Sequence, residues 1–217
     1  MLIPLWLTLK VALLATLFAG LAGIGLAWWL SRRQFPGKNI LDAMLVLPMV
    51  LPPTVIGYYL IVLIGRNGVL GRHLHDWLGI NLMFTWQGAV IAASVVSLPL
   101  VYKGARAAFE EVDGRFAHAA RTLGAGEFEL FIRIALPLAI RGIAAGLMLA
   151  FARAMGEFGA TLMIAGNLPG RTQTLSIAVY EAVQAGDDGR ALWLTLIISV
   201  VCMVVLVASG RLLQAKH

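Results

Sequence analysis

The sequence predicts an all-α membrane protein with about five transmembrane helices, and two observations predict this fold class. Hydrophobic residues make up 60% of the 217 residues and charged residues only 13%, whereas a soluble domain is about a quarter charged. A bilayer core of about 30 Å needs roughly 20 apolar helical residues, and five apolar runs reach that length. They lie in a single predicted domain, 1–217, near residues 5–30, 40–64, 83–103, 137–165 and 191–212.

The first run is too long for the apolar core of a signal peptide, and no basic segment precedes it. It ends in Ser31, Arg32 and Arg33 rather than at a small-residue cleavage site, so we expect a retained span. Small residues recur every four positions in this run and in the fourth, which lets helices pack closely. They are Ala15, Ala19, Gly23 and Ala27 in the first run and Gly142, Gly146, Ala150 and Ala154 in the fourth.

The second run contains three prolines, Pro48, Pro52 and Pro53. A proline inside a helix removes an amide donor and clashes with the preceding turn, so we expect a break in this span. In a membrane such a break is tolerated where the freed backbone is buried in protein or lines a wet cavity. Pro52, Pro53 and Thr54 are therefore candidates for a translocation path, and a kink used only for packing is the alternative.

The net charge of +6 follows a membrane topology rather than the basic stripe of a nucleic-acid-binding protein. With the N-terminus outside, the inner segments hold most of the Lys and Arg residues, as the positive-inside rule requires. The sequence thus predicts a cytoplasmic C-terminus and an odd number of spans. The single cysteine, Cys202, allows no intrachain disulfide. The inner cations are Arg32, Arg33, Lys38, Lys103, Arg106, Arg115, Arg121, Arg133, Arg141, Arg211 and Lys216, and the outer ones are Lys10, Arg66, Arg72, Arg171 and Arg190.

Between the third and fourth runs lies an inner loop of about residues 104–136. Apolar residues recur with a helical period from Phe109 to Leu123, opposite a charged face, and predict an amphipathic helix. Glycines at 124 and 126 interrupt it, a short helix is expected over 127–134, and Pro137 suits the start of the fourth span. The apolar face must be covered, either by a soluble partner or by lipid headgroups at the membrane surface.

The spacing in this loop resembles the EAA loop of ABC importer permeases, which has two alanines, a glycine four residues later, and then isoleucine-x-leucine-proline. His118 stands where the family usually has a glutamate, so that glutamate's salt bridge is not expected here. The resemblance implies that the elbow fits a groove of a cytoplasmic ATPase subunit and couples ATP use to the membrane path. The coupling residues would be His118, Ala119, Ala120, Gly124, Ile134, Leu136 and Pro137.

A further segment, 151–161, contains Arg153 and Glu157 four residues apart. Charges inside a span normally face a partner or a wet cavity, so we expect these two to pair near the path, with direct anion binding by Arg153 as the alternative. The segment resembles the molybdate and sulfate branch of these permeases, as does the outer segment Arg171-Thr-Gln-Thr-Leu.

Within this branch, 217 residues and five spans resemble the molybdate permeases. The resemblance implies import of molybdate, with tungstate as a companion, across a bacterial inner membrane by alternating access. It also implies a homodimer in membrane lipid, joined by two ATPase subunits and an external molybdate-binding protein.

Two alternatives remain open at this point: a permease for sulfate, thiosulfate or another oxyanion, and an ion-gradient-driven secondary transporter or channel. The sequence has no phosphate-binding loop, so this chain is not expected to hydrolyse ATP or to be an enzyme. We expect no metal or cofactor on it, because ATP would be used by the partner subunit.

Overall fold

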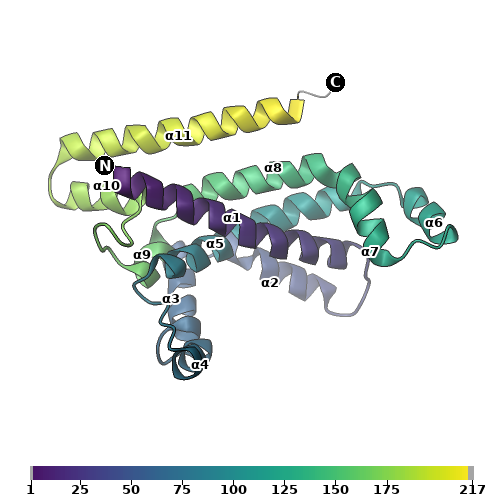
Figure 1. The fold of residues 1–217 in the computed structure, drawn as a ribbon, viewed down its shortest axis with the longest axis horizontal. Coiled ribbons are helices and arrows are strands. Elements are labelled where there is room, and N and C mark those ends of the chain that lie inside the picture. Colours follow the sequence, from purple (N-terminus) through teal and green to yellow (C-terminus); the bar gives the residue numbers. More distant parts are fainter. Residues whose placement is uncertain (1, 215–217) are drawn as a thin grey trace.

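The computed structural model describes residues 2–214, without the side chains at 2, 208–209 and 211–214. Arg211 and Lys216, two of the predicted inner cations, therefore lie outside the described side chains. Every regular element in the described part is a helix (Figure 1). These are α1 (Leu2–Ser31), α2 (Lys38–Val50), α3 (Pro53–Ile64), α4 (Val69–Leu78), α5 (Trp86–Glu110), α6 (Gly114–Thr122), α7 (Glu127–Leu130), the π-helix η1 (Phe131–Ala135), α8 (Leu136–Met155), α9 (Gly159–Ala165), α10 (Leu175–Gln184) and α11 (Asp188–Gln214).

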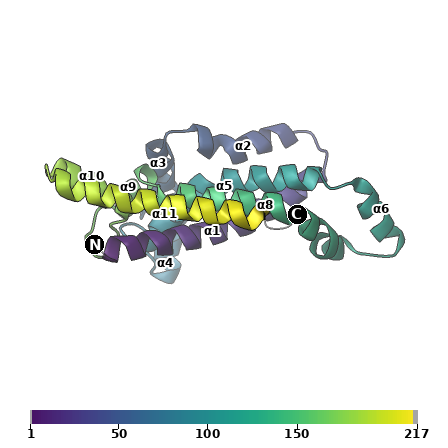
Figure 2. The same cartoon turned by 90° about the horizontal axis from the view of Figure 1, so that it is seen from above.

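Four helical stretches are long and apolar enough to cross a membrane: α1, α5, the run from α7 to α8, and α11. The pair α2 and α3 passes the same test together but is bent by 116° at its break. Counting this pair as one broken span gives five, which confirms the predicted fold class. Figures 1 and 2 show the long helices side by side, with α6 beyond one end of the bundle and α10 at the other.

Helix α5 packs against both α1 and α8, and small residues permit these contacts. A Cβ at Gly104 of α5 would lie 3.0 Å from the Cα of Gly146 in α8, so the two backbones touch there. A Cβ at Gly23 of α1 would lie 3.1 Å from the amide nitrogen of Tyr102 in α5. The small-residue faces predicted in the first and fourth spans are therefore packing surfaces, and both pack on α5.

The second span is broken at its prolines. Pro48 remains inside α2, but the helix ends before Pro52. Pro53 occupies the first turn of α3, where a missing amide donor costs nothing. Helix α3 runs across the direction of the long helices and packs against α9 (Figure 1). Gly57 of α3 allows this close packing, because a Cβ there would lie 2.7 Å from the Cβ of Met163 in α9.

The loop predicted over residues 104–136 begins later than predicted. Helix α5 does not end at Lys103 but continues to Glu110, because its last turns stay buried and Phe109 is only 6% exposed. The amphipathic helix begins after Asp113 rather than at Phe109. Asp113 caps this new helix by accepting a hydrogen bond from the Arg115 amide.

The fourth span differs from the prediction at both ends. Pro137 follows no break, because helical backbone runs from Glu127 through η1 into α8. Residue 137 has no amide to donate one turn back, and the wider π turn directly before it accommodates the proline. At the other end α8 stops at Met155, and α9 follows as a separate helix after 156–158. The predicted span 137–165 is therefore two helices.

The connections predicted to lie outside contain two helices that the apolar runs do not reveal. Helix α4 forms within the polar connection around residues 66–81, and α10 forms over the segment after Thr174. The start of α10 is held on α1, because the Leu175 amide donates a hydrogen bond of 2.8 Å to Oγ1 of Thr8.

Candidate functional site

The segment from α6 to α7 projects from the bundle as a helix, a glycine turn and a second helix (Figures 1 and 2). The amide of Ala125 donates to the carbonyl of Ala120 at 3.0 Å, and the amide of Gly124 donates to that of Arg121 at 3.0 Å. This is a Schellman motif, which needs a left-handed residue at the turn, and Gly124 has φ +86°. Apart from its chain neighbours, no described atom lies within 4 Å of a Cβ built at Gly124. The backbone angle, and not lack of space, therefore favours glycine here.

The start of α6 depends on Asp113. Its carboxylate accepts a hydrogen bond of 2.7 Å from Nε of Arg115 and one of 2.9 Å from the Arg115 amide. These bonds hold the pKa of the Asp113 carboxyl below its ordinary value of 3.8. The carboxylate is therefore charged at neutral pH, and it lies at the positive end of the helix dipole.

The residues that match the EAA spacing lie on both legs of this elbow. His118, Ala119 and Ala120 belong to α6, Gly124 makes the turn, and the remaining three belong to η1 and the start of α8. Exposure separates these residues: His118, Ala119, Gly124 and Pro137 are exposed, Ile134 and Leu136 are half-buried, and Ala120 is buried.

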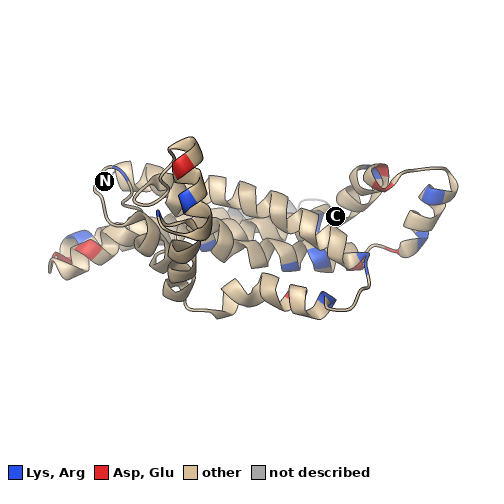
Figure 3. Cartoon of the chain, turned by 90° about the horizontal axis from the view of Figure 1, so that it is seen from below, with Lys and Arg blue, Asp and Glu red and all other residues tan. Residues whose placement is uncertain are grey.

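Large apolar side chains remain uncovered on the projecting elbow. Phe116 is 54% exposed, Leu123 is 88% exposed and Phe128 is 78% exposed. Burying such a side chain fully contributes about 1.5–3 kcal/mol, so this surface favours a covering partner. The apolar pattern of the predicted amphipathic helix ends at Leu123, so it does not indicate Phe128, which lies beyond the glycine turn. Figure 3 shows acidic and basic residues close together on the same projecting end.

The predicted pair of Arg153 and Glu157 is present, with Nη1 of Arg153 2.8 Å from Oε2 of Glu157. The glutamate side chain is 1% exposed and the arginine 35%. The other carboxylate oxygen accepts a hydrogen bond of 2.9 Å from the Ala160 amide in the first turn of α9. Glu157 thus links the end of α8 to the start of α9. The pair carries no net charge, which weighs against Arg153 as a free anion ligand.

The breaks in the second and fourth spans lie side by side. A Cβ at Gly159, where α9 begins, would lie 3.1 Å from the Cβ of Pro53 and 3.3 Å from the amide nitrogen of Thr54. Pro52 and Thr54 are exposed there. The sequence indicates the proline break and the Arg–Glu pair separately, and only the fold brings them together. Helix ends that meet inside a membrane protein are typical of substrate sites in transporters.

A polar cluster that the sequence reasoning missed holds α2 on α5. Asp42 of α2 accepts a hydrogen bond of 2.6 Å from the Tyr102 hydroxyl and pairs with Arg106 and, at 3.4 Å, with Lys103. Arg106 also pairs with Glu110 at 2.8 Å. The available signal is the four-residue spacing of Tyr102, Arg106 and Glu110, which places them on one helix face. Asp42, the acid that faces them, lies on another helix, so no spacing in the sequence indicates it.

The arrangement of these helices is that of the permease subunits of ABC importers. The solved inward-facing MetNI methionine ABC transporter shares this fold, with a TM-score of 0.71 at 16% identity, over 98% of this chain and 94% of that one.

The chain belongs to the family described as "Binding-protein-dependent transport system inner membrane component", whose model matches residues 19–216. It is therefore an integral inner-membrane transport subunit and not an enzyme. Family membership also removes the secondary transporter and the channel as alternatives.

Two relatives refine the branch. The chain is 51% identical over 187 residues to the molybdenum transport system permease protein ModB of Escherichia coli K12, covering 85% of this chain and 82% of that protein. It is 36% identical over 206 residues to the sulfate transport system permease protein CysT of Salmonella typhimurium, covering 95% and 72%. The resemblance to the molybdate and sulfate branch is confirmed, and the identity is higher on the molybdenum side.

Proposed function

We propose that this chain is the membrane-spanning permease of an ATP-driven importer of molybdate. The observation that supports molybdate as the substrate is the 51% identity to ModB, against 36% to the sulfate permease CysT. Molybdate, tungstate and sulfate are all tetrahedral dianions. Tungstate is therefore expected as a companion substrate, and sulfate, thiosulfate or another oxyanion is the competing proposal.

The proposed assembly is a homodimer of this chain with two cytoplasmic ATPase subunits and an external molybdate-binding protein. The exposed apolar side chains of the elbow support docking of an ATPase subunit there, with Gly124 shaping the turn. His118 and Ala119 would lie at that contact, since both are exposed on α6. ATP would be bound by the partner, and this chain would hold no cofactor of its own.

The proposed path passes the place where the two broken spans meet. Pro52, Pro53 and Thr54 come from one break, and Arg153 and Glu157 from the other. Helix breaks leave backbone groups without intrahelical partners, which a wet cavity can satisfy. A neutral Arg–Glu pair would let a dianion pass without holding it tightly, which suits alternating access.

The proposed orientation places the N-terminus outside and the C-terminus in the cytoplasm. The end of the bundle that carries the elbow holds Arg32, Arg33 and Lys38, which supports an inner location. Helix α11 runs from the α10 end toward the elbow end (Figure 1), in keeping with a C-terminus on the same side as the elbow.

The proposed function is tested by uptake of labelled molybdate in cells that lack this chain and in cells that have it restored, with and without excess sulfate. Restored uptake that resists sulfate and stops on ATP depletion, with the proton gradient held, is the expected result. Uptake abolished by sulfate, or restored for sulfate alone, would refute molybdate as the substrate.

A further inference from the structure

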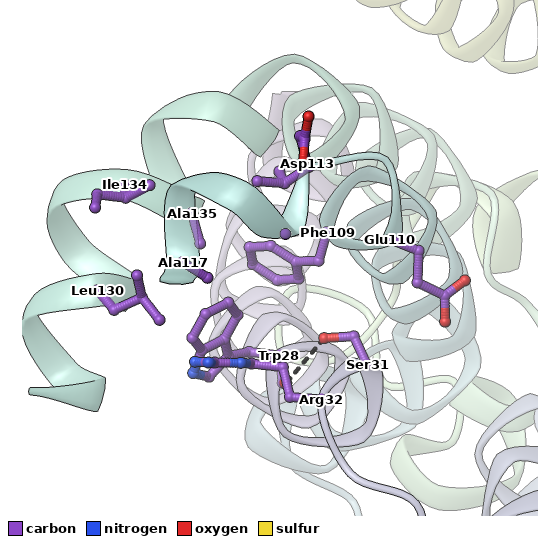
Figure 4. Close-up of a pocket in the computed structure, with 12 residues that line it drawn as sticks. Trp28, Ser31, Arg32, Phe109, Glu110, Asp113, Ala117, Leu130, Ile134 and Ala135 are labelled. Atoms are coloured by element: carbon purple, nitrogen blue, oxygen red, sulfur yellow. Dashed lines mark hydrogen bonds between the residues drawn. The ribbon is translucent and has the colours of Figure 1, made fainter. Parts of the chain in front are cut away.

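Helix α6 stands off from the bundle rather than packing on it. A cavity of about 300 Å³ lies between it and the inner ends of the long helices. Figure 4 shows Ala117 of α6 on one side, with Phe109, Trp28 and Leu130 around the hollow. Because α6 has so little packing of its own, the position of this helix depends on the few groups that tie the elbow to the bundle.

One such tie is a cluster of three aromatic rings from three elements. The ring of Trp28, near the end of α1, lies 5.3 Å from that of Phe109 at the end of α5 and 5.2 Å from that of Phe131 in η1. The rings of Phe109 and Phe131 lie 6.1 Å apart. Edge-on and tilted aromatic pairs at such distances stabilise packing beyond the effect of their buried area. Helix α1 therefore contacts the end of α5, which precedes the elbow, and η1 on its second leg, although it is remote from both in sequence.

The second tie is ionic and begins on the same tryptophan. The guanidinium carbon of Arg32 lies 4.3 Å from the centre of the Trp28 ring, and its Nη1 lies 2.5 Å from Oε2 of Glu127. The other oxygen of Glu127 accepts a hydrogen bond of 3.1 Å from Nε of Arg121 in the last turn of α6. Both carboxylate oxygens of Glu127 are engaged, one by Arg32, the residue directly after α1, and one by Arg121 of α6. The carboxylate thus bridges the projecting helix to Arg32 at the end of the first span, and Arg32 in turn lies on the Trp28 ring of α1.

We propose that Glu127 and Arg32 are positioning residues that transmit movement of α6 to α1. In this scheme the force from a docked ATPase subunit reaches the bundle by three routes: through the chain into α5, through η1 into α8, and through the bridge from Glu127 to Arg32 and Trp28 into α1. The inference rests on the proposed docking of an ATPase subunit at the elbow. It adds a first-span contact that the EAA-like spacing does not include.

The exposure of the bridge makes it testable without unfolding the protein. The side chain of Glu127 is 66% exposed and that of Arg32 is 20% exposed. An ion pair with a solvent-exposed carboxylate contributes little to stability, so neutral replacements should fold and assemble. The ion pair of Glu129 with Arg133, at 2.7 Å on the same leg of the elbow, offers a matched control because neither residue belongs to the first span.

The test uses the complete importer in lipid nanodiscs, with wild-type chain, Arg32→Gln, Glu127→Gln, the double variant and Glu129→Gln. Three quantities are measured: the amount of ATPase subunit retained, the stimulation of ATP hydrolysis by molybdate-loaded binding protein, and the ATP consumed per molybdate transported. We expect retained assembly but about fivefold weaker stimulation and more ATP per molybdate in Arg32→Gln and Glu127→Gln. Since the two side chains act through each other, the double variant should lose no more stimulation than the more impaired of the two single variants. Glu129→Gln should match wild type.

Two results would overturn the inference while leaving the proposed function intact. One is wild-type stimulation in both single variants, and the other is an equal loss in Glu129→Gln. A wild-type complex that loaded binding protein does not stimulate would instead refute the proposed function, before any variant is compared.

Discussion

Substitutions at Gly124 distinguish two contributions to docking of the ATPase subunit: the backbone conformation of the turn and the surface that the turn exposes. Gly124 has φ +86° and its Cβ direction is open, so Gly124→Ala introduces backbone strain without a clash. A left-handed alanine costs about 1–2 kcal/mol relative to glycine, whereas asparagine visits this region readily. Because the undocked elbow has little packing, the variant turn can relax to an unstrained conformation, and docking must return it to the strained one.

The expected magnitude follows from that cost. The apparent affinity for the ATPase subunit falls with the fraction of elbow in the competent shape, so Gly124→Ala should weaken binding about 5- to 30-fold. Gly124→Asn, which adds a larger side chain but tolerates the angle, should lie within about 2- to 3-fold of wild type. Gly124→Asp tolerates the angle as well but places a charge on the docking surface.

The assay is titration of ATPase subunit against permease in nanodiscs, with membrane insertion confirmed for each variant. The reasoning would be refuted if Gly124→Asn bound as weakly as Gly124→Ala, because close contact with the partner would then require glycine instead of the turn. Wild-type binding by Gly124→Ala would refute it equally.

Three other predictions concern packing, the buried pair and the cap of α6. Gly104→Val should separate α5 from α8 and cost about 1–3 kcal/mol, seen as a lower unfolding temperature in detergent, whereas Gly25→Val, where no described atom lies within 4 Å of the added Cβ, should not. Glu157→Gln leaves Arg153 without its carboxylate and should destabilise the protein by about 1–3 kcal/mol, with a matching loss of uptake; unchanged stability would contradict the buried pair. Because the Asp113 pKa is lowered in the folded elbow, its cap is fully present above 3.8 and is lost as pH falls through the lowered value. Hydrogen exchange at the Arg115 amide should therefore be faster in Asp113→Ala at neutral pH, and equal protection in both proteins would contradict the cap.

Local features of the sequence were sufficient to predict the spans and the elbow. Apolar runs of bilayer length, prolines at 52 and 53 and a glycine after an amphipathic period all act on neighbouring residues. The Arg153 and Glu157 pair was predicted for the same reason, since four residues bring two side chains together on or near a helix.

Helix boundaries were less well predicted, because burial by distant segments overrides local signals. Packing against Trp28 extends α5 past Lys103, and a π turn lets Pro137 follow the preceding helix without a break. Neither effect is visible in the residues of the affected helix alone.

The contacts that join remote segments were decided by the tertiary structure alone. The contact of Gly159 with Pro53 and Thr54 and the bridge from Glu127 to Arg32 join residues that share no sequence period. The sequence by itself determined that this chain crosses the membrane and presents a glycine elbow, because hydrophobic length and backbone angle are local properties. Which helix ends meet, and which span the elbow contacts, depend on packing between helices, because close approach of two backbones is a property of both at once.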